Sequence, residues 1–400
     1  MIPVEMPIFV PMNINLRSFR EFLQSGMAGG IILLGCVLIS LFIANSSAGP
    51  AFEKLLATEW GPSVHLRYSL LAWINDGLMA IFFLLVGLEI KRELVEGELS
   101  SPKKAALPIL AAVGGAIIPA LIFTLLNRGT STAGGWGIPM ATDIAFAIAI
   151  ITLLGKKAPP SLKIFLAALA IVDDLLAILV IAVFYTSDLH YTYLLYAAGL
   201  VALLVVFNLS GVKKLVFYLV PGLFIWYFIH HSGIHATIAG VLVAMTLPTT
   251  RGAAESPLEK LEHLLLTPVN FVIMPLFALV NTNIRFDSEM LGGLTTPLGL
   301  GIILGLVLGK PIGITLISRL AVKLGISTLP EGTGWTHIFG VGILAGIGFT
   351  MSVFISLLSF TGQALPLSQA KFSILLASVL AGICGSIFLT SLHRSKQKIR

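Results

Sequence analysis

The segment Ile164–Thr186 constrains the fold more than any other part of the chain. It is apolar throughout except for Asp173 and Asp174 at its middle and Tyr185 and Thr186 at its end, and it contains no basic residue. As an α-helix rising ~1.5 Å per residue, it is long enough to cross a hydrocarbon core of roughly 30 Å. An ionised Asp at that depth costs about 2.5–3.5 kcal/mol on insertion scales. Two carboxylates kept there indicate a process that carries charge.

The composition agrees with a chain that lies in a membrane. Hydrophobic residues make up 56% of it and charged residues 11%, whereas soluble domains carry about 25% charged residues. We therefore expect an all-α polytopic membrane protein rather than a soluble one. The net charge of +6 is explained by basic residues in the loops, which set the orientation of a membrane protein. It is therefore not taken as a sign of nucleic-acid binding. Cys36 and Cys384 both lie in apolar runs, too few for a disulfide framework.

Breaks at charges, Gly, Pro and Asn divide the chain into twelve candidate transmembrane helices. The first apolar stretch, Gly26–Ala44, is long for a signal peptide and is taken as a spanning helix. The predicted spans are roughly 22–44, 70–90, 107–127, 134–155, 161–186, 192–210, 213–230, 233–248, 258–282, 298–321, 334–360 and 368–392.

The basic residues support this count. With the N-terminus in the cytoplasm, 19 of the 25 Lys and Arg fall on the cytoplasmic side and five on the other, and Lys310 alone lies inside a span. Such an asymmetry is what the positive-inside rule predicts. We thus expect an N-terminal cytoplasmic extension over 1–21, one twelve-helix domain over 22–392 and a cytoplasmic tail over 393–400.

Two of the spans are expected to be interrupted helices. In 134–155, Gly and Pro precede Asp143 well inside the membrane, and in 334–360 Gly340, Gly342, Gly346 and Gly348 break the run. Discontinuous helices at corresponding places of two halves mark the binding site of many secondary transporters. The alternative is that these glycines only allow close helix packing.

The Asp173–Asp174 pair is the first candidate site. Neighbouring side chains on a helix diverge by about 100°, so at least one carboxylate must face a cavity or a partner. Carboxylate oxygens replace the water of a sodium ion and also bind protons, and two neighbouring buried carboxyls titrate as a coupled unit. Cation and proton would then compete for one site. A structural polar clamp between helices is the alternative.

Three further residues belong to this hypothesis. Lys310 is too far from either membrane surface to reach it, so it either pairs with Asp173 or Asp174, offsets the negative ends of broken helices, or carries a proton itself. Asp143 begins the half-helix after the Gly-Pro stretch and is expected to cap it and balance its dipole. Thr142 offers a hydroxyl ligand to a cation.

A second group of titratable residues lies near the end of the second span. Glu89, Arg92 and Glu93 share one helix face by their i, i+3, i+4 spacing. Together with His235, Glu262 and His263 they could respond to pH near neutrality, although ordinary interfacial charges are the alternative interpretation.

The chain resembles the NhaA family of sodium/proton antiporters over roughly residues 19–391, and four motifs carry the resemblance. They are Pro139-Met-Ala-Thr-Asp143-Ile-Ala-Phe-Ala, Ala170-Ile-Val-Asp173-Asp174-Leu, Gly87-Leu-Glu-Ile-Lys-Arg-Glu93 and Gly309-Lys310-Pro311. The resemblance implies an inverted-repeat transporter fold with two interrupted, crossing helices. It also implies electrogenic, pH-regulated exchange of sodium or lithium for more than one proton.

The resemblance further assigns residues and partners. Asp173 and Asp174 would form the cation and proton site with Thr142 adjacent. Asp143 and Lys310 would balance helix-end charges, and Lys310 would also pair with Asp173. Glu89, Arg92, Glu93, His235, Glu262 and His263 would serve in pH activation. Sodium, lithium and protons would be the substrates, in the lipid of a bacterial inner membrane, with no cofactor and no nucleic acid. A homodimer, formed partly through a β-hairpin within Glu53–Ser69, is also implied.

Other function classes fit the sequence less well. An intramembrane aspartyl protease needs facing carboxylates from two helices, whereas these are adjacent, and the sequence contains no Gly-x-Gly-Asp. A cation channel needs rings of repeated ligands. A sodium-coupled symporter of similar fold remains the alternative, although the residues named above offer ion ligands and little recognition of an organic substrate. We therefore expect a transporter and not an enzyme.

Overall fold

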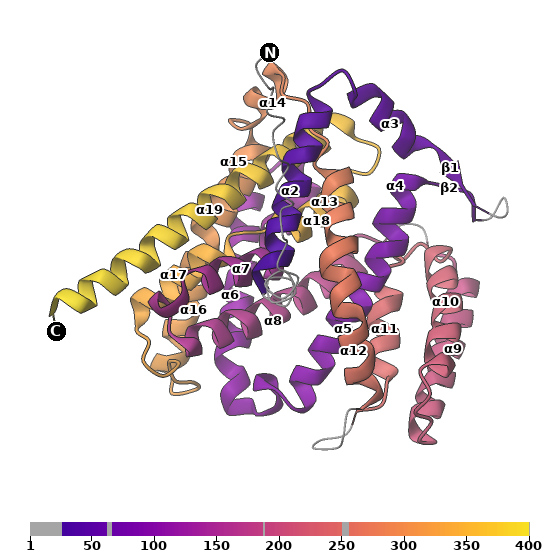
Figure 1. Cartoon of the computed structure of the whole chain (residues 1–400), viewed down its shortest axis with the longest axis horizontal. Helices are drawn as coiled ribbons and strands as arrows, with labels where there is room; N and C mark the ends of the chain where they lie inside the picture. Colours follow the sequence, from indigo (N-terminus) through magenta and orange to yellow (C-terminus); the bar gives the residue numbers. More distant parts are fainter. Residues whose placement is uncertain (1–25, 62–65, 187–188, 250–255, 400) are drawn as a thin grey trace, which may run out of the picture.

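The computed structural model describes residues 26–61, 66–186, 189–249 and 256–399, which excludes the predicted extension 1–21. These residues form a helical bundle (Figure 1). The helices are α2 (Gly26–Ala44), α3 (Gly49–Ala57), α4 (Leu70–Ala72), α5 (Met79–Val95), α6 (Pro102–Leu126), α7 (Ile144–Leu153), α8 (Pro160–Phe184), α9 (Tyr191–Leu209), α10 (Val216–His230), α11 (Ile238–Thr246), α12 (Pro257–Pro268), α13 (Met274–Asn281), α14 (Ser288–Gly293), α15 (Pro297–Leu304), α16 (Lys310–Lys323), α17 (Trp335–Ala345), α18 (Phe349–Ser359) and α19 (Ala364–Ile399).

Short 3₁₀ and π-helical segments join or precede several of these helices. The 3₁₀ segments are η3 (Glu98–Ser100), η4 (Ala133–Met140) and η5 (Gly155–Lys157). The π-helical segments are η2 (Trp73–Leu78), η6 (Val269–Ile273) and η7 (Gly305–Gly309), each inside a longer run of helix. Single π-helical turns of this kind are often found at functional sites.

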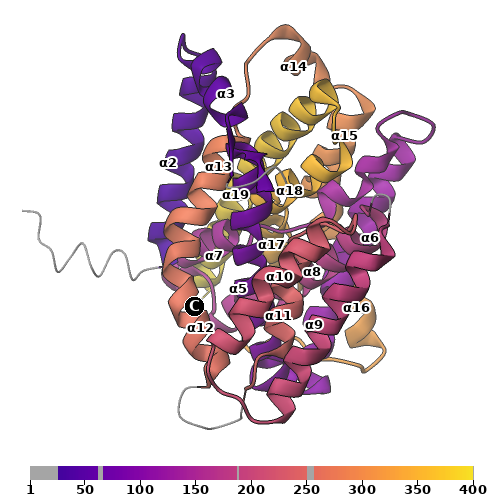
Figure 2. The same cartoon turned by 90° about the vertical axis from the view of Figure 1, so that its right-hand side faces the viewer.

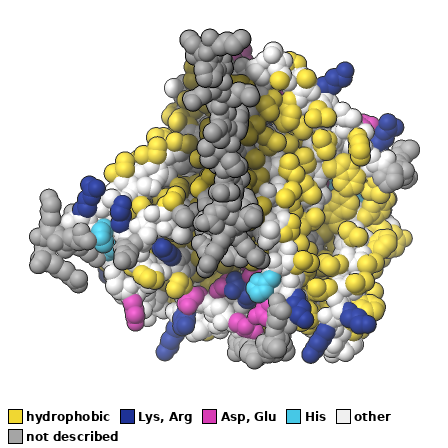
Figure 3. Space-filling model, in the orientation of Figure 1, with side chains coloured by type: hydrophobic (Ala, Val, Ile, Leu, Met, Phe, Trp, Pro, Cys, Tyr) yellow, Lys and Arg dark blue, Asp and Glu magenta, His cyan; other side chains and the backbone are white. Residues whose placement is uncertain are grey.

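Many of these helices are long and apolar enough to cross a membrane. By length and composition the described residues hold eight such helices, or up to ten if each of two bent pairs is one span. Large apolar side chains also point outward, as on α9, where Leu209 is 82% exposed, and much of the face in Figure 3 is hydrophobic. A surface of this kind needs lipid around it. The chain is therefore a multi-pass membrane protein, and the count of twelve spans stays a prediction.

Helix α8 lies at the centre of the bundle. It packs against α5, α6, α7 and α17, and about two thirds of its most apolar window is buried. By contrast, α9 and α10 pack on one another at one side (Figures 1 and 2) and use a separate hydrophobic cluster shared with α11. The middle of α8, which holds Asp173 and Asp174, is thus shielded from lipid as well as from water.

Helices α6 and α16 approach one another through glycine. A Cβ on Gly114 would lie 2.4 Å from the carbonyl oxygen of Gly313, and a Cβ on Gly313 would lie 2.1 Å from that of Gly114. Any other residue would force the backbones apart, as at small-residue contacts in membrane helices generally. This contact brings Lys310, one turn before Gly313, into the core of the bundle.

Two runs of helix are irregular near the centre. The 3₁₀ segment η4 is followed by non-helical residues 141–143 before α7 begins. Helices α17 and α18 meet at an angle of 50°. Glycine is needed at that bend, because a Cβ on Gly346 would lie 2.4 Å from the carbonyl oxygen of Leu306.

Some predicted boundaries differ from the structure. The hairpin expected over Glu53–Ser69 is shorter: residues 53–57 belong to α3, and only Glu59–Trp60 (β1) and Tyr68–Ser69 (β2) pair, in antiparallel register. Gly49 and Pro50 start α3, since proline is favoured in the first helical turn. The predicted boundary at residue 392 falls inside α19, which continues to Ile399.

Candidate functional site

The paired carboxylates lie in the middle of α8 and are buried. Asp173 and Asp174 are each 2% exposed. Asp173 Oδ2 accepts hydrogen bonds from the Lys310 ammonium and from the Thr142 hydroxyl, the latter over 2.6 Å. The Oδ1 atoms of Asp173 and Asp174 are buried without a hydrogen-bond partner among the described residues. Two buried acceptor oxygens without donors are costly, so they mark a place where a cation or proton would be stabilised.

The structure shows which of the two carboxylates, Asp173 or Asp174, pairs with Lys310. It is fully buried and forms an ion pair with Asp173. Its ammonium also donates to the Thr142 hydroxyl over 2.9 Å. The π-helical segment η7 ends directly before Lys310. The pair is thus built from α8 and α16, two helices far apart in the sequence.

Thr142 connects this pair to the bend between α17 and α18. Its hydroxyl oxygen lies 2.9 Å from the carbonyl oxygen of Ala345, the last residue of α17, as well as 2.6 Å from Asp173 Oδ2. A hydroxyl has one proton, so it donates to only one of these acceptors at a time. Thr142 can therefore respond to a change in the charge on Asp173.

Asp143 caps α7, as predicted, and also binds the second irregular segment. Its Oδ1 accepts from the backbone N–H of Phe146 over 3.0 Å. Its Oδ2 accepts from the backbone N–H of Thr350 over 3.0 Å and from the Thr350 hydroxyl, while its own N–H donates to the carbonyl of Ile347. One carboxylate thus serves the N-terminal ends of α7 and α18, where positive dipole ends favour negative charge.

Thr350 is a residue of the site that sequence analysis did not single out. It is 1% exposed and occupies the first turn of α18. The signal that could have identified it is a hydroxyl two positions after Gly348, in the first turn of a helix, where the hydroxyl and the backbone N–H can both donate.

The structure brings part of the predicted pH group together. Arg92 Nε lies 3.1 Å from Glu262 Oε2, joining α5 to α12, and Arg92 Nη2 lies 3.4 Å from Glu93 Oε1. Glu89 is half-buried one turn earlier on α5, and His263 is exposed beside Glu262.

Lys91, which lies next to this cluster on α5, was not predicted as a site residue. Its ammonium binds the carbonyls of Met245 and Leu247 at the C-terminal end of α11, where cations are favoured.

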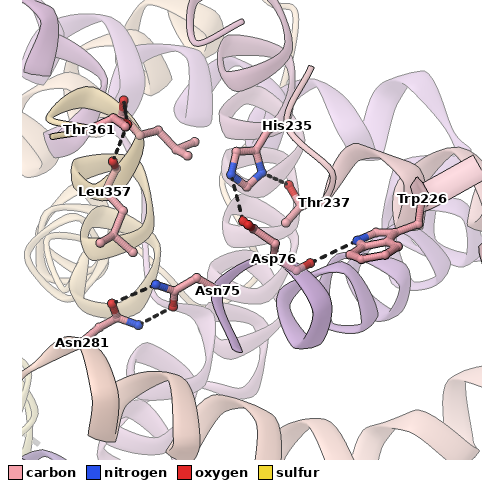
Figure 4. A network of polar contacts seen from close by, with 9 residues as sticks. Asn75, Asp76, Trp226, His235, Thr237, Asn281, Leu357 and Thr361 are labelled. Carbon is pink, nitrogen blue, oxygen red and sulfur yellow. Dashed lines mark hydrogen bonds and ion pairs between the residues drawn. The ribbon is translucent and has the colours of Figure 1, made fainter. Parts of the chain in front are cut away.

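His235 does not belong to that cluster. Its Nε2 lies 3.5 Å from Asp76 Oδ1, and its Nδ1 lies 3.0 Å from the Thr237 hydroxyl (Figure 4). Asp76 and Glu89 are thirteen residues apart on one helical run, which is roughly 20 Å at 1.5 Å per residue. His235 is therefore near the opposite end of α5 from Arg92. The prediction that it lies in one cluster with Arg92 and Glu262 is wrong.

The same end of the bundle holds a reciprocal amide pair. Asn281 Nδ2 donates to Asn75 Oδ1 over 2.7 Å, and Asn75 Nδ2 donates to Asn281 Oδ1 over 3.4 Å (Figure 4). The pair ties η2 to the last residue of α13. The pair lies near Asp76 and His235 (Figure 4).

Comparison with known proteins assigns the family. The family model described as Na+/H+ antiporter 1 matches residues 20–389. The chain belongs to this family. It is 65% identical to a protein of Flavobacterium johnsoniae named Na(+)/H(+) antiporter NhaA 2, over 96% of this chain and 95% of that relative. It is 50% identical to the Na(+)/H(+) antiporter NhaA of Dechloromonas aromatica, over 94% and 96% of the two chains. The family resemblance inferred from the four motifs is confirmed.

Proposed function

We propose that the chain is a sodium/proton antiporter whose shared binding site is the Asp173–Asp174 pair. The observation that carries this proposal is the pair of buried Oδ1 atoms, in the core of a multi-pass bundle, that have no hydrogen-bond partner within the described part of the chain. Sodium and protons are proposed as the substrates because the two relatives described above are named Na(+)/H(+) antiporters. The symporter alternative is not favoured, because the cited relatives are named antiporters.

Exchange follows from the charges at the site. With both carboxylates ionised, the single buried ammonium of Lys310 leaves an excess negative charge in a medium where isolated charges are expensive. Either a cation or protons must therefore accompany the pair. Sodium is bound through several oxygens, and the unpartnered Oδ1 atoms with the Thr142 hydroxyl could supply them. Loading sodium then expels protons, and loading protons expels sodium.

Lys310 would act as an internal counter-ion. When the site holds no sodium, its ammonium neutralises Asp173. When sodium binds, the ammonium and the metal ion compete for the same carboxylate, and either Lys310 moves or it loses its proton. The second route would add a transported proton.

We propose several further properties of this antiporter. They are a stoichiometry above one proton per sodium, electrogenic transport, transport of lithium, and activity without a cofactor. They also include twelve spans in an inverted repeat, with η4–α7 and α17–α18 as the interrupted helices, cytoplasmic termini in a bacterial inner membrane, and a homodimer. The Arg92–Glu262 cluster and, at the other end, His235 are proposed to adjust activity to pH.

Reconstituted protein tests the proposal. Proteoliposomes carrying a pH-sensitive dye are exposed to sodium, lithium and potassium across a range of pH. We expect proton movement with sodium and lithium and none with potassium, and both Asp173→Asn and Asp174→Asn should reduce it to background. Calorimetry in buffers of different ionisation enthalpy then measures proton release on sodium binding. Sodium binding without proton release would rule out a shared site.

A further inference from the structure

A recess of about 410 Å³ lies away from the paired carboxylates, between the α7–α8 connection, the start of α17 and the end of α19. The titratable side chains that line it are all basic. It is lined by Lys157, Lys163, His337 and His393, together with Pro159 and Pro160 and two small residues, and none of the residues that line it is acidic. Its volume is within the range of small-molecule sites.

The two lysines have no acidic partner in the described part of the chain. Lys157 is exposed and Lys163 is half-buried, so both ammonium groups can reach a molecule in the recess. Two cations facing one space repel one another. An anion bound between them would remove this repulsion.

The backbone adds to the positive character of the recess. Helix α8 begins at Pro160 and helix α17 at Trp335, so the first turns of two helices border the recess. Helix N-termini attract phosphate groups. The Ser161 hydroxyl donates to the carbonyl of Glu331 over 2.7 Å, which ties the start of α8 to the connection that leads into α17.

The surroundings favour a lipid as the source of the anion. Leu153 at the end of α7 and Ile164 near the start of α8 are 62% and 51% exposed, and Ile387 on α19 is 65% exposed. Exposed apolar side chains thus occur on each of these helices within six residues of a residue that lines the recess, while the basic residues lie at the helix ends. Basic pockets between membrane helices bind anionic lipid headgroups.

We propose that this recess binds the phosphate of an anionic phospholipid, with Lys157 and Lys163 on the phosphate and the acyl chains along α7, α8 and α19. The site is separate from the sodium/proton site, and its ligand is not transported. Free inorganic phosphate shares the chemistry of the headgroup but cannot use the apolar surface.

Native mass spectrometry of the purified full chain tests this proposal. Phosphatidylglycerol, phosphatidylcholine and inorganic phosphate are titrated separately. The Lys157→Gln/Lys163→Gln variant is compared with Lys103→Gln/Lys104→Gln, which removes the same charge from two exposed lysines at the start of α6. We expect the first variant to bind phosphatidylglycerol about thirty-fold more weakly and the second to match the wild type.

Several outcomes would overturn the proposal. They are equal affinity for phosphatidylcholine, an equal loss in the α6 variant, and unchanged affinity in the Lys157/Lys163 variant. Saturation of the recess by millimolar inorganic phosphate, with no preference for the lipid, would assign the site to a free anion instead. If the double variant does not fold, each single substitution is expected to weaken lipid binding about five-fold, and an unchanged affinity in both would equally refute the site.

Discussion

Replacing Lys310 with alanine is the sharpest test of the buried ion pair. The substitution removes the cation that binds Asp173 and leaves a carboxylate in the core with only the Thr142 hydroxyl as a donor. Breaking a buried pair from one side costs about 3–5 kcal/mol. At ~2.1 cal/mol/K per residue, the unfolding entropy of a 400-residue chain is roughly 0.8 kcal/mol/K. The melting temperature should therefore fall by about 4–6 °C.

The assay is thermal unfolding in detergent, monitored by intrinsic fluorescence, at several pH values. Protonation of Asp173 at acidic pH removes the unpaired charge, so the gap between Lys310→Ala and the wild type should narrow as pH falls. Lys323→Ala is the matched control, because Lys323 is exposed at the far end of the same helix and should change stability by about 0.5 kcal/mol at most.

A double variant decides whether the two residues act as a pair. Asp173→Asn with Lys310→Ala removes both charges and should recover most of the stability lost in Lys310→Ala. If the double variant is no more stable than the single one, or if Lys310→Ala melts with the wild type at neutral pH, the pairing argued here is wrong.

Three other substitutions probe the surrounding structure. Thr350→Val removes a hydroxyl donor to Asp143 and should lower the free energy of unfolding by about 1.5–3 kcal/mol, whereas Thr350→Ser should not; equal melting of both would exclude this hydrogen bond. Gly114→Ala places a Cβ 2.4 Å from a backbone oxygen and should cost about 1–3 kcal/mol, whereas Gly134→Ala, with open space around it, should be tolerated; similar losses would contradict the close contact of α6 and α16. Glu262→Gln breaks the ion pair with Arg92 and should move the pH profile of sodium-driven exchange; an unmoved profile would make this ion pair purely structural.

Local chemistry made the capping role of Asp143 predictable. An acidic residue after a Gly-Pro stretch and before an apolar helix can hardly serve another local purpose. The burial of Asp173 and Asp174 was predictable for a similar reason, since a spanning helix holds its middle residues away from water. Lys310 was recognised as buried from its distance to the ends of its own span.

Partners across helices could not be predicted in this way. Lys310 is 137 residues from Asp173 in the sequence, and nothing local distinguishes Asp173 from Asp174 as its partner. His235 was grouped with Glu262 on residue type and on the family resemblance, yet the packing of α5 against α11 and α12 places the two at opposite ends of α5. Thr350 was missed because its role depends on a carboxylate contributed by another helix.

The peptide bond between Thr142 and Asp143 has a consequence for how occupancy is communicated. The first residue contacts the carboxylate that would hold the cargo, and the second fastens the starts of α7 and α18. A displacement of the Thr142 backbone is shared with Asp143 across a planar peptide unit, so it reaches the residue that holds the starts of α7 and α18. The residue that contacts Asp173 and the residue that holds two helix starts are thus neighbours in the chain, and no long relay of side chains is required between them.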